Sequence, residues 1–225
     1  MKHIALVLAT LLFLHLTDLH SQTINFEKDR LQPVNVSMSV ERLMGKQVVK
    51  VIKDSGIKAA DQPTFVKIEG INFKNGTIEA DVLSRLLPNA PSLARGFIGI
   101  AFRVNDSNSK FECIYIRPTN GRAENQLQRN HAIQYFSYPD YDFERFRKEA
   151  PGEYEAYADM GLNEWIKLRI VVEDTKARLF LNNSKQPSLV VTDLKHGTDL
   201  SGAIGLWVDV RTEGYFSNVK VYQNK

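Results

Sequence analysis

The segment RGFIGIAFRVNDSNSKFECIYIRP, residues 95–118, carries the strongest fold signal in the 225-residue chain. Apolar residues occupy every second position from 98 to 104, so an extended strand there would bury one face in a core. The core face is Ile98, Ile100, Phe102 and Val104, and the far face is Phe97, Gly99, Ala101 and Arg103. The polar turn 105–109 leads into a second strand with Ile114 and Ile116 inward and Cys113, Tyr115 and Arg117 on the far face. These strands predict a packed sheet whose far face offers a polar trough.

The same alternation recurs along the chain and predicts further strands. We expect them at residues 34–41, 47–53, 65–68, 77–83, 165–172, 178–181, 202–210 and 215–222. No internal repeat or low-complexity tract separates them. The predicted fold class is therefore all-β, a two-sheet antiparallel β-sandwich (jelly roll) formed by one domain at residues 22–225. Trp165 opens one of these strands and is predicted to be structural.

Residues 1–21 have the pattern of a signal peptide. Lys2 precedes an apolar run from Ile4 to Leu16, and the chain becomes polar directly afterwards. The run is shorter than the roughly 20 residues that a membrane span needs. We predict cleavage after Ser21, export to the periplasm or the extracellular space, and no membrane span after signal removal.

The composition excludes several classes of function. Lys and Arg total 29 against 26 Asp and Glu without a basic block, so nucleic acid is not an expected partner. Cys113 is the single cysteine and forms no intramolecular disulfide. Only His131 and His196 lie beyond the signal, without metal-ligand spacing, so we predict no metal site and no cofactor. Calcium, held by carboxylates and carbonyls, stays open.

Residues 119–161 interrupt the strand pattern, and a connection of this length in a compact domain is usually functional. The segment is rich in aromatic residues, and Asp142 can cap a short helix that runs through Glu149 before Pro151. Aromatic rings with interspersed arginines suit a saccharide, although the rings can equally form a satellite core beneath the loop. The ligand contacts predicted in this insertion are Arg122, His131, Gln134 and Tyr135. His131 is also a candidate proton carrier.

The order of these motifs resembles the concanavalin A-like lectin/glucanase superfamily, most closely the bacterial exported sandwiches related to laminin G-like modules and 3-keto-disaccharide hydrolase domains. The motifs are TIEADV, GFIGIAFR, FECIYIRP, EWIKLRIVVEDTKARLFLNN and GAIGLWVDVRTEGYFSNVKVY, and the resemblance covers residues 73–222. It implies the fold well and the activity poorly, because this superfamily hosts lectins, hydrolases, lyases and adhesion modules.

The resemblance also implies a ligand across the concave sheet. The residues expected there are Glu79, Asp81, Arg103, Tyr115, Arg117, Trp207 and Asp209. Laminarinase-type members carry ExDxxE on one strand, whereas this chain reads EADVLS from Glu79 and lacks the third carboxylate. A retaining laminarinase is therefore disfavoured, and Glu79 with Asp81 remains a candidate acid/base pair.

Three functions compete at this point. The first is an exported protein that binds or hydrolyses an oligosaccharide or polysaccharide. The second is a polysaccharide lyase, in which an arginine neutralises a uronate and Tyr115 or His131 abstracts the adjacent proton. The third is a non-catalytic adhesion or scaffold module.

Overall fold

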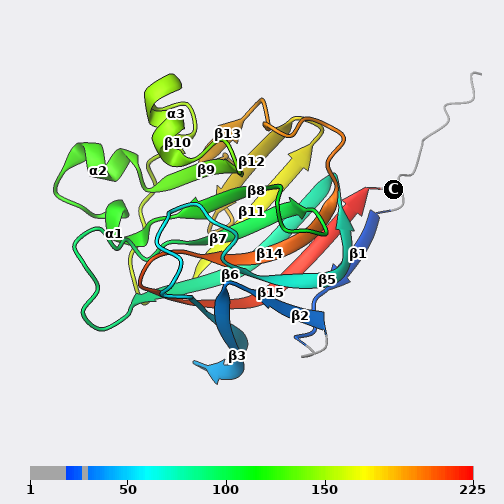
Figure 1. Ribbon diagram of the computed structural model, residues 1–225, viewed down its shortest axis with the longest axis horizontal. Coiled ribbons are helices and arrows are strands. Elements are labelled where there is room, and N and C mark those ends of the chain that lie inside the picture. The colour runs from blue at the N-terminus through cyan, green and yellow to red at the C-terminus, as the bar shows by residue number, and fades with distance from the viewer. Residues whose placement is uncertain (1–18, 27–29, 225) are drawn as a thin grey trace, which may run out of the picture.

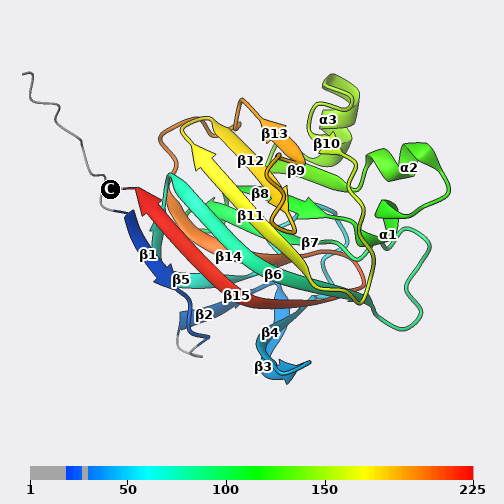
Figure 2. The same cartoon turned by 180° about the vertical axis from the view of Figure 1, so that it is seen from behind.

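The computed structural model describes residues 19–26 and 30–224 and consists of two antiparallel sheets packed face to face (Figures 1 and 2). The eight-stranded sheet contains β1 (Leu19–Thr23), β3 (Val36–Leu43), β4 (Lys46–Lys53), β6 (Gly76–Leu86), β11 (Ile166–Glu173), β12 (Lys176–Leu181), β13 (Leu189–Val191) and β15 (Thr212–Asn224). The seven-stranded sheet contains β2 (Leu31–Val34), β5 (Phe65–Phe73), β7 (Ile98–Val104), β8 (Phe111–Ile116), β9 (Ile133–Tyr138), β10 (Glu155–Ala156) and β14 (Gly202–Val208). The predicted two-sheet sandwich is confirmed.

Strand order brings distant parts of the chain together. The eight-stranded sheet runs β13-β12-β11-β6-β15-β4-β3, with β1 also paired to β15, and the seven-stranded sheet runs β10-β9-β8-β7-β14-β5-β2. Most of the predicted signal peptide, residues 1–18, lies outside the described residues. The predicted cleavage site after Ser21 falls inside β1, where Ser21 pairs with Tyr222.

The main core lies between the sheets and follows the predicted alternation. Ile100 pairs with Ile114 across β7 and β8, and both side chains are fully buried. Val82 of β6 enters the same core from the opposite sheet. Burying these side chains stabilises the sandwich by roughly 25 cal/mol for each Å² of apolar surface removed from water.

One end of β7 departs from the predicted alternation. Val104 pairs with Ala203 and Ala101 pairs with Gly205, so β7 carries one extra residue in a β-bulge. Arg103 within it adopts a left-handed backbone with φ of 54°. Val104 consequently joins the apolar cluster on the outer face of the sheet, not the main core, which corrects the predicted facing.

The insertion at 119–161 is largely ordered secondary structure. It begins just after the start of α1 (Pro118–Gly121), includes α2 (Gln126–Asn130) and α3 (Phe143–Glu149), and adds β9 and β10 to one edge of the seven-stranded sheet. The Asp142 side chain accepts a hydrogen bond from the backbone N–H of Arg145, which confirms the predicted helix cap. Helices in the described ranges are all too short and polar to cross a membrane.

The outer face of the seven-stranded sheet is covered, not open. The segment 54–64, between β4 and β5, crosses in front of this sheet as the cyan loop in Figure 1. Trp207 Nε1 donates to the Gln62 carbonyl at 2.8 Å, and the backbone N–H of Asp61 donates to Asp209 Oδ2 at 3.1 Å. We call residues 54–64 the covering segment. Beneath it, Phe65, Phe136 and Trp207 belong to a second apolar cluster.

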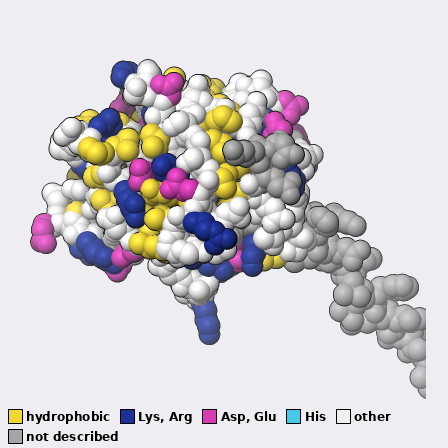
Figure 3. Space-filling model, turned by 90° about the horizontal axis from the view of Figure 1, so that it is seen from below, with side chains coloured by type: hydrophobic (Ala, Val, Ile, Leu, Met, Phe, Trp, Pro, Cys, Tyr) yellow, Lys and Arg dark blue, Asp and Glu magenta, His cyan; other side chains and the backbone are white. Residues whose placement is uncertain are grey.

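Charges are mixed on the face seen in Figure 3. Lys and Arg side chains are interspersed there with Asp, Glu and hydrophobic side chains. The exclusion of nucleic acid stays a prediction from the sequence.

Candidate functional site

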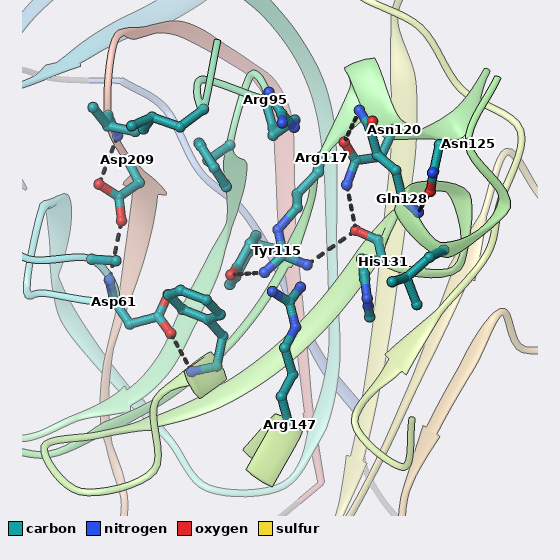
Figure 4. Close-up of a pocket in the computed structure, with 16 residues that line it drawn as sticks. Asp61, Arg95, Tyr115, Arg117, Asn120, Asn125, Gln128, His131, Arg147 and Asp209 are labelled. Atoms are coloured by element: carbon teal, nitrogen blue, oxygen red, sulfur yellow. Dashed lines mark hydrogen bonds between the residues drawn. The ribbon is translucent and has the colours of Figure 1, made fainter. Parts of the chain in front are cut away.

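A cavity of about 560 Å³ lies at one end of the covered face, between the covering segment and the helices of the insertion. Figure 4 shows its side chains pointing toward one another from both walls. We call it the Arg117 pocket. It is lined by Ala60, Asp61, Leu93, Arg95, Phe97, Tyr115, Arg117, Asn120, Asn125, Leu127, Gln128, His131, Phe143, Arg147, Asp209 and Val210.

Arg117 follows β8 and is held in place by several acceptors. Its Nη2 donates to the Tyr115 hydroxyl at 2.6 Å and to Gln134 Oε1 at 3.2 Å. Its Nη1 donates to the His131 carbonyl at 3.0 Å and to Glu155 Oε1 at 3.3 Å. The guanidinium is thus fixed at the back of the pocket before any ligand arrives.

Glu155 on β10 is the carboxylate around which the cations gather. Arg147 of α3 donates from Nη2 to Glu155 Oε1 at 2.6 Å, and His131 Nδ1 lies 2.7 Å from Glu155 Oε2. The imidazole is turned away from the line of a hydrogen bond, so Nδ1 has a close but poorly aligned neighbour. Burial lowers the pKa of His131 against the opposing effect of Glu155, while Arg147 and Arg117 lower it further. His131 is therefore neutral at neutral pH and able to accept a proton.

Asp61 brings a carboxyl to the opposite wall. Its backbone φ is 53°, its side chain is 2% exposed, and the N–H of Phe143 donates to its Oδ2 at 2.8 Å. The pKa of Asp61 is raised to about 7, mainly by burial and also by Asp209, while the Phe143 N–H and Arg117 act against the rise. A carboxyl group that is half protonated near neutral pH is suited to donating a proton.

Asp209 and Tyr115 complete the wall around Asp61. Asp209 Oδ1 forms a buried ion pair with Lys53, and the N–H of Val210 donates to the same oxygen at 2.6 Å. These contacts fix the covering segment against the strand end. Burial raises the pKa of the Tyr115 phenol well above its ordinary value, so the hydroxyl stays protonated.

The structure brings four of the predicted site residues into one pocket. They are Tyr115, Arg117, His131 and Asp209. Gln134 lies directly behind, fully buried, and contacts Arg117 without lining the cavity. The expectation that the insertion lies over one end of the sheet therefore agrees with the geometry.

Three further predicted ligand contacts are fully buried and do not line the Arg117 pocket. The expectation that Arg103, Tyr115, Arg117 and Trp207 share one exposed surface is wrong, and Tyr135, predicted as a ligand contact in the insertion, lies in the core. Trp207 is on the expected face but lies beneath the covering segment, with its ring 4.7 Å from that of Tyr115. Tyr135 points into the main core, because it pairs with the inward-facing Ile114, and its hydroxyl donates to Glu112 at 2.7 Å. Arg103 is turned by the bulge toward the loops at the other end of the sandwich.

Three other predicted residues lie away from the pocket. Glu79 and Asp81 occupy the outer face of the eight-stranded sheet, because their neighbour Ala80 faces the core, and they pair with Lys167 and Lys46. They are therefore not brought together with His131. Arg122 is an exposed side chain that forms ion pairs with Asp159 and Glu164.

Sequence reasoning missed Asp61, Arg95, Arg147 and Glu155. Asp61 lies in a turn-rich connection without periodicity, and Arg147 lies on a helix whose facing the sequence leaves open. The one signal in the sequence was the concentration of arginines in residues 95–147, which hold seven of them. Among the described residues, no group of three His, Cys, Asp or Glu side chains is arranged to hold a metal ion.

Comparison with known proteins gives a fold and no family. No family model and no curated protein matches the chain. A candidate glycosyl hydrolase from Parabacteroides distasonis ATCC 8503 is similar, with a TM-score of 0.51 and 14% identity over 88% of this chain and 89% of that one. The carbohydrate-binding module CBM66 from Bacillus subtilis gives a TM-score of 0.47 and 12% identity over 87% and 92%. The likeness to the candidate glycosyl hydrolase shows a shared fold, the two-sheet β-sandwich that the sequence predicted.

Proposed function

We propose that the protein binds a saccharide in the Arg117 pocket and hydrolyses a glycosidic bond there. The observation that carries this proposal is a cavity of about 560 Å³, large enough for a sugar ring, in which a buried carboxyl lies opposite a neutral histidine and fixed guanidinium groups. The related fold of a candidate glycosyl hydrolase agrees with this class of ligand. The resemblance alone would support binding and hydrolysis equally.

The walls of the pocket match the two surfaces of a sugar ring. Phe97 and Phe143 offer aromatic faces for the CH groups of a pyranose. Asn120 and Gln128 provide amides for hydroxyls, and Asn120 is already oriented by its bond to the His131 carbonyl at 2.9 Å. Such a small set of polar groups within an apolar wall is typical of small-molecule sites.

The acid/base pair would work in one displacement. The protonated Asp61 carboxyl gives its proton to the glycosidic oxygen as the bond from that oxygen to the anomeric carbon breaks. His131 takes a proton from the attacking water as the water oxygen bonds to the anomeric carbon. A proton passed from His131 through solvent to Asp61 then restores the starting state. Arg147 and Glu155 position His131.

A lyase is the second candidate, favoured by the three arginines that line the pocket. In that reaction an arginine would neutralise the carboxylate of a uronate while a base removes the adjacent proton. The raised pKa of Tyr115 makes its phenol a poor base, so His131 would have to serve. A non-catalytic module would bind the same saccharides without turnover.

Substitution of the acid and the base tests the proposal. We expect Asp61→Asn and His131→Gln to keep saccharide binding on a glycan array and each to lower turnover by about 10² to 10⁴-fold. Arg122→Ala is the matched control outside the pocket and should change neither. New reducing ends indicate hydrolysis, whereas an unsaturated, ultraviolet-absorbing product indicates the lyase. Full activity in both pocket variants would refute the assignment.

We also propose that the protein acts after export, as one domain from residue 22 onward. The support is the leader-like sequence at residues 1–21. Fractionation of cells, with mass determination of the secreted chain, tests the location and the cleavage position together.

A further inference from the structure

The Arg117 pocket holds more cationic than anionic side chains. Arg95, Arg117 and Arg147 line it, and the latter two share one carboxylate, Glu155. Asp209, another carboxylate on its wall, already forms a buried ion pair with Lys53. Without a ligand, the guanidinium groups are therefore undercompensated.

Arg95 is the group whose charge is left over. Its Nη1 donates to the backbone carbonyls of Ser92 and Ala94, and within residues 19–26 and 30–224 no ion pair includes it. Burial lowers the pKa of the Arg95 guanidinium, and the positive charge of Arg117 lowers it further. Two like charges thus lie near enough to repel across a cavity, an arrangement that an anion relieves.

The acidic wall of the pocket opposes an anion only in part at neutral pH, and less as the pH falls below 7. Asp61 is half protonated near pH 7, and its protonated form donates a hydrogen bond instead of repelling a carboxylate. Resting on the function proposed above, we infer that the saccharide bound in this pocket carries a carboxylate, as uronic acids do, and that Arg95 binds it while the positive charge of Arg117 adds to the attraction. The fork of a guanidinium matches the two oxygens of a carboxylate.

The test compares oligosaccharides that differ only in charge. Three probes are used. The first is a glucuronate-containing oligosaccharide, the second is the same oligosaccharide after reduction of the carboxyl to an alcohol, and the third is an oligosaccharide without uronate that carries one sulfate ester as its only charge. By titration calorimetry at neutral pH we expect the glucuronate probe to bind about tenfold or more tightly than the reduced probe. Added salt should weaken binding of the glucuronate probe more than binding of the reduced probe.

Variants locate the effect in the pocket. Arg95→Gln should lower the affinity for the glucuronate probe about tenfold and change the affinity for the reduced probe by no more than about twofold. The affinity of Arg95→Lys for the glucuronate probe should lie between those of the wild type and Arg95→Gln. Arg178→Gln, which removes an exposed arginine on β12, is the matched control and should change neither affinity. Equal effects of Arg95→Gln on both probes would overturn the role of Arg95.

The outcomes separate this inference from the proposed function. Binding of the reduced probe with equal or greater affinity would refute the carboxylate and leave saccharide binding intact. Sulfated probes that bind as tightly as the glucuronate would overturn the carboxylate in favour of a general anion site. Absence of binding by every probe would remove both proposals.

Discussion

The two ends of the seven-stranded sheet each hold a buried arginine, and the two arginines do different work. Arg103 donates to the carbonyls of Lys74, Asp174 and Gly197 at 2.7 to 2.8 Å and to the Asn75 side chain at 3.1 Å. It fastens three connections to one strand end. Arg117 is equally well bonded, yet an open cavity lies beside it.

The difference teaches that a buried charge is not by itself a sign of a site. Arg103 and Arg117 each make four hydrogen bonds within the chain, but only Arg117 lines the cavity, and burial lowers the pKa of Arg103. Arg117 shares one acceptor, Glu155, with Arg147, and their neighbour Arg95 forms no ion pair among the described residues. The Arg117 end of the seven-stranded sheet differs from the Arg103 end in having both a cavity and an excess of positive charge, whereas burial is common to the two.

The largest effect is expected at the structural end. Arg103→Met should lower the free energy of unfolding by about 3 to 5 kcal/mol, because it leaves buried carbonyls without a donor. Chemical denaturation measures this. Saccharide binding by the folded fraction should be unchanged, whereas Arg117→Met should lose binding. Wild-type stability in Arg103→Met would break the contrast.

Asp61 should make stability depend on pH. Its pKa rises from 3.8 to about 7 on folding, so the folded state binds more protons and stability falls as pH rises between these values. The destabilisation caused by Asp61 is absent below pH 4 and complete above pH 7, where it lowers the free energy of unfolding by roughly 4 kcal/mol. Asp61→Asn should remove it, giving a flatter curve of unfolding free energy against pH. Parallel wild-type and variant curves would show that Asp61 has an ordinary pKa.

Trp165→Ala should have a moderate effect on stability alone. The ring is half-buried on the outer face of the eight-stranded sheet, against a cluster of Val48, Leu83 and Tyr215, with Lys46 Nζ 4.6 Å from its centre. We expect a loss of about 1 to 3 kcal/mol, less than for a fully buried tryptophan. An unchanged melting temperature would show that the ring does not contribute to stability. Weakened saccharide binding would place the ligand on the eight-stranded sheet, away from the Arg117 pocket.

The smallest effect is expected from the carboxylates of the eight-stranded sheet. Glu79→Gln and Asp81→Asn each break a surface ion pair far from the Arg117 pocket. Turnover and binding should equal those of the wild type in steady-state and calorimetric assays. A loss of turnover in either variant would move the reaction to the opposite face of the sandwich.

The sequence predicted the elements that rest on local patterns. The hairpin around residues 95–118, the strands and the Asp142 cap each follow from alternation or from a side chain near its own backbone. Arg103 was misplaced because one extra residue in β7 turns it away from the expected face. Trp207 was placed on the right face, but a segment some 145 positions earlier in the chain covers it.

The pocket itself depends on contacts that no local pattern contains. The pKa of Asp61 is raised mainly because other parts of the chain bury it, and its backbone N–H contact with Asp209 and the Phe143 N–H on its carboxyl fix it in that position. Arg147 joins the site through Glu155, which lies on a two-residue strand. Such long-range packing sets the pKa and the charge balance, so chemistry was less predictable than fold.

The covering segment has a consequence for how this architecture diversifies. In the proposed reaction, the acid Asp61 comes from this segment between β4 and β5, whereas the three arginines lie just after β8, on α3 and on the connection before β7. A related chain with a shorter covering segment would keep the three arginines, lose the proposed proton donor, and expose the apolar cluster around Trp207. Within this fold, a hydrolase and a non-catalytic saccharide-binding protein would then differ in the covering segment alone.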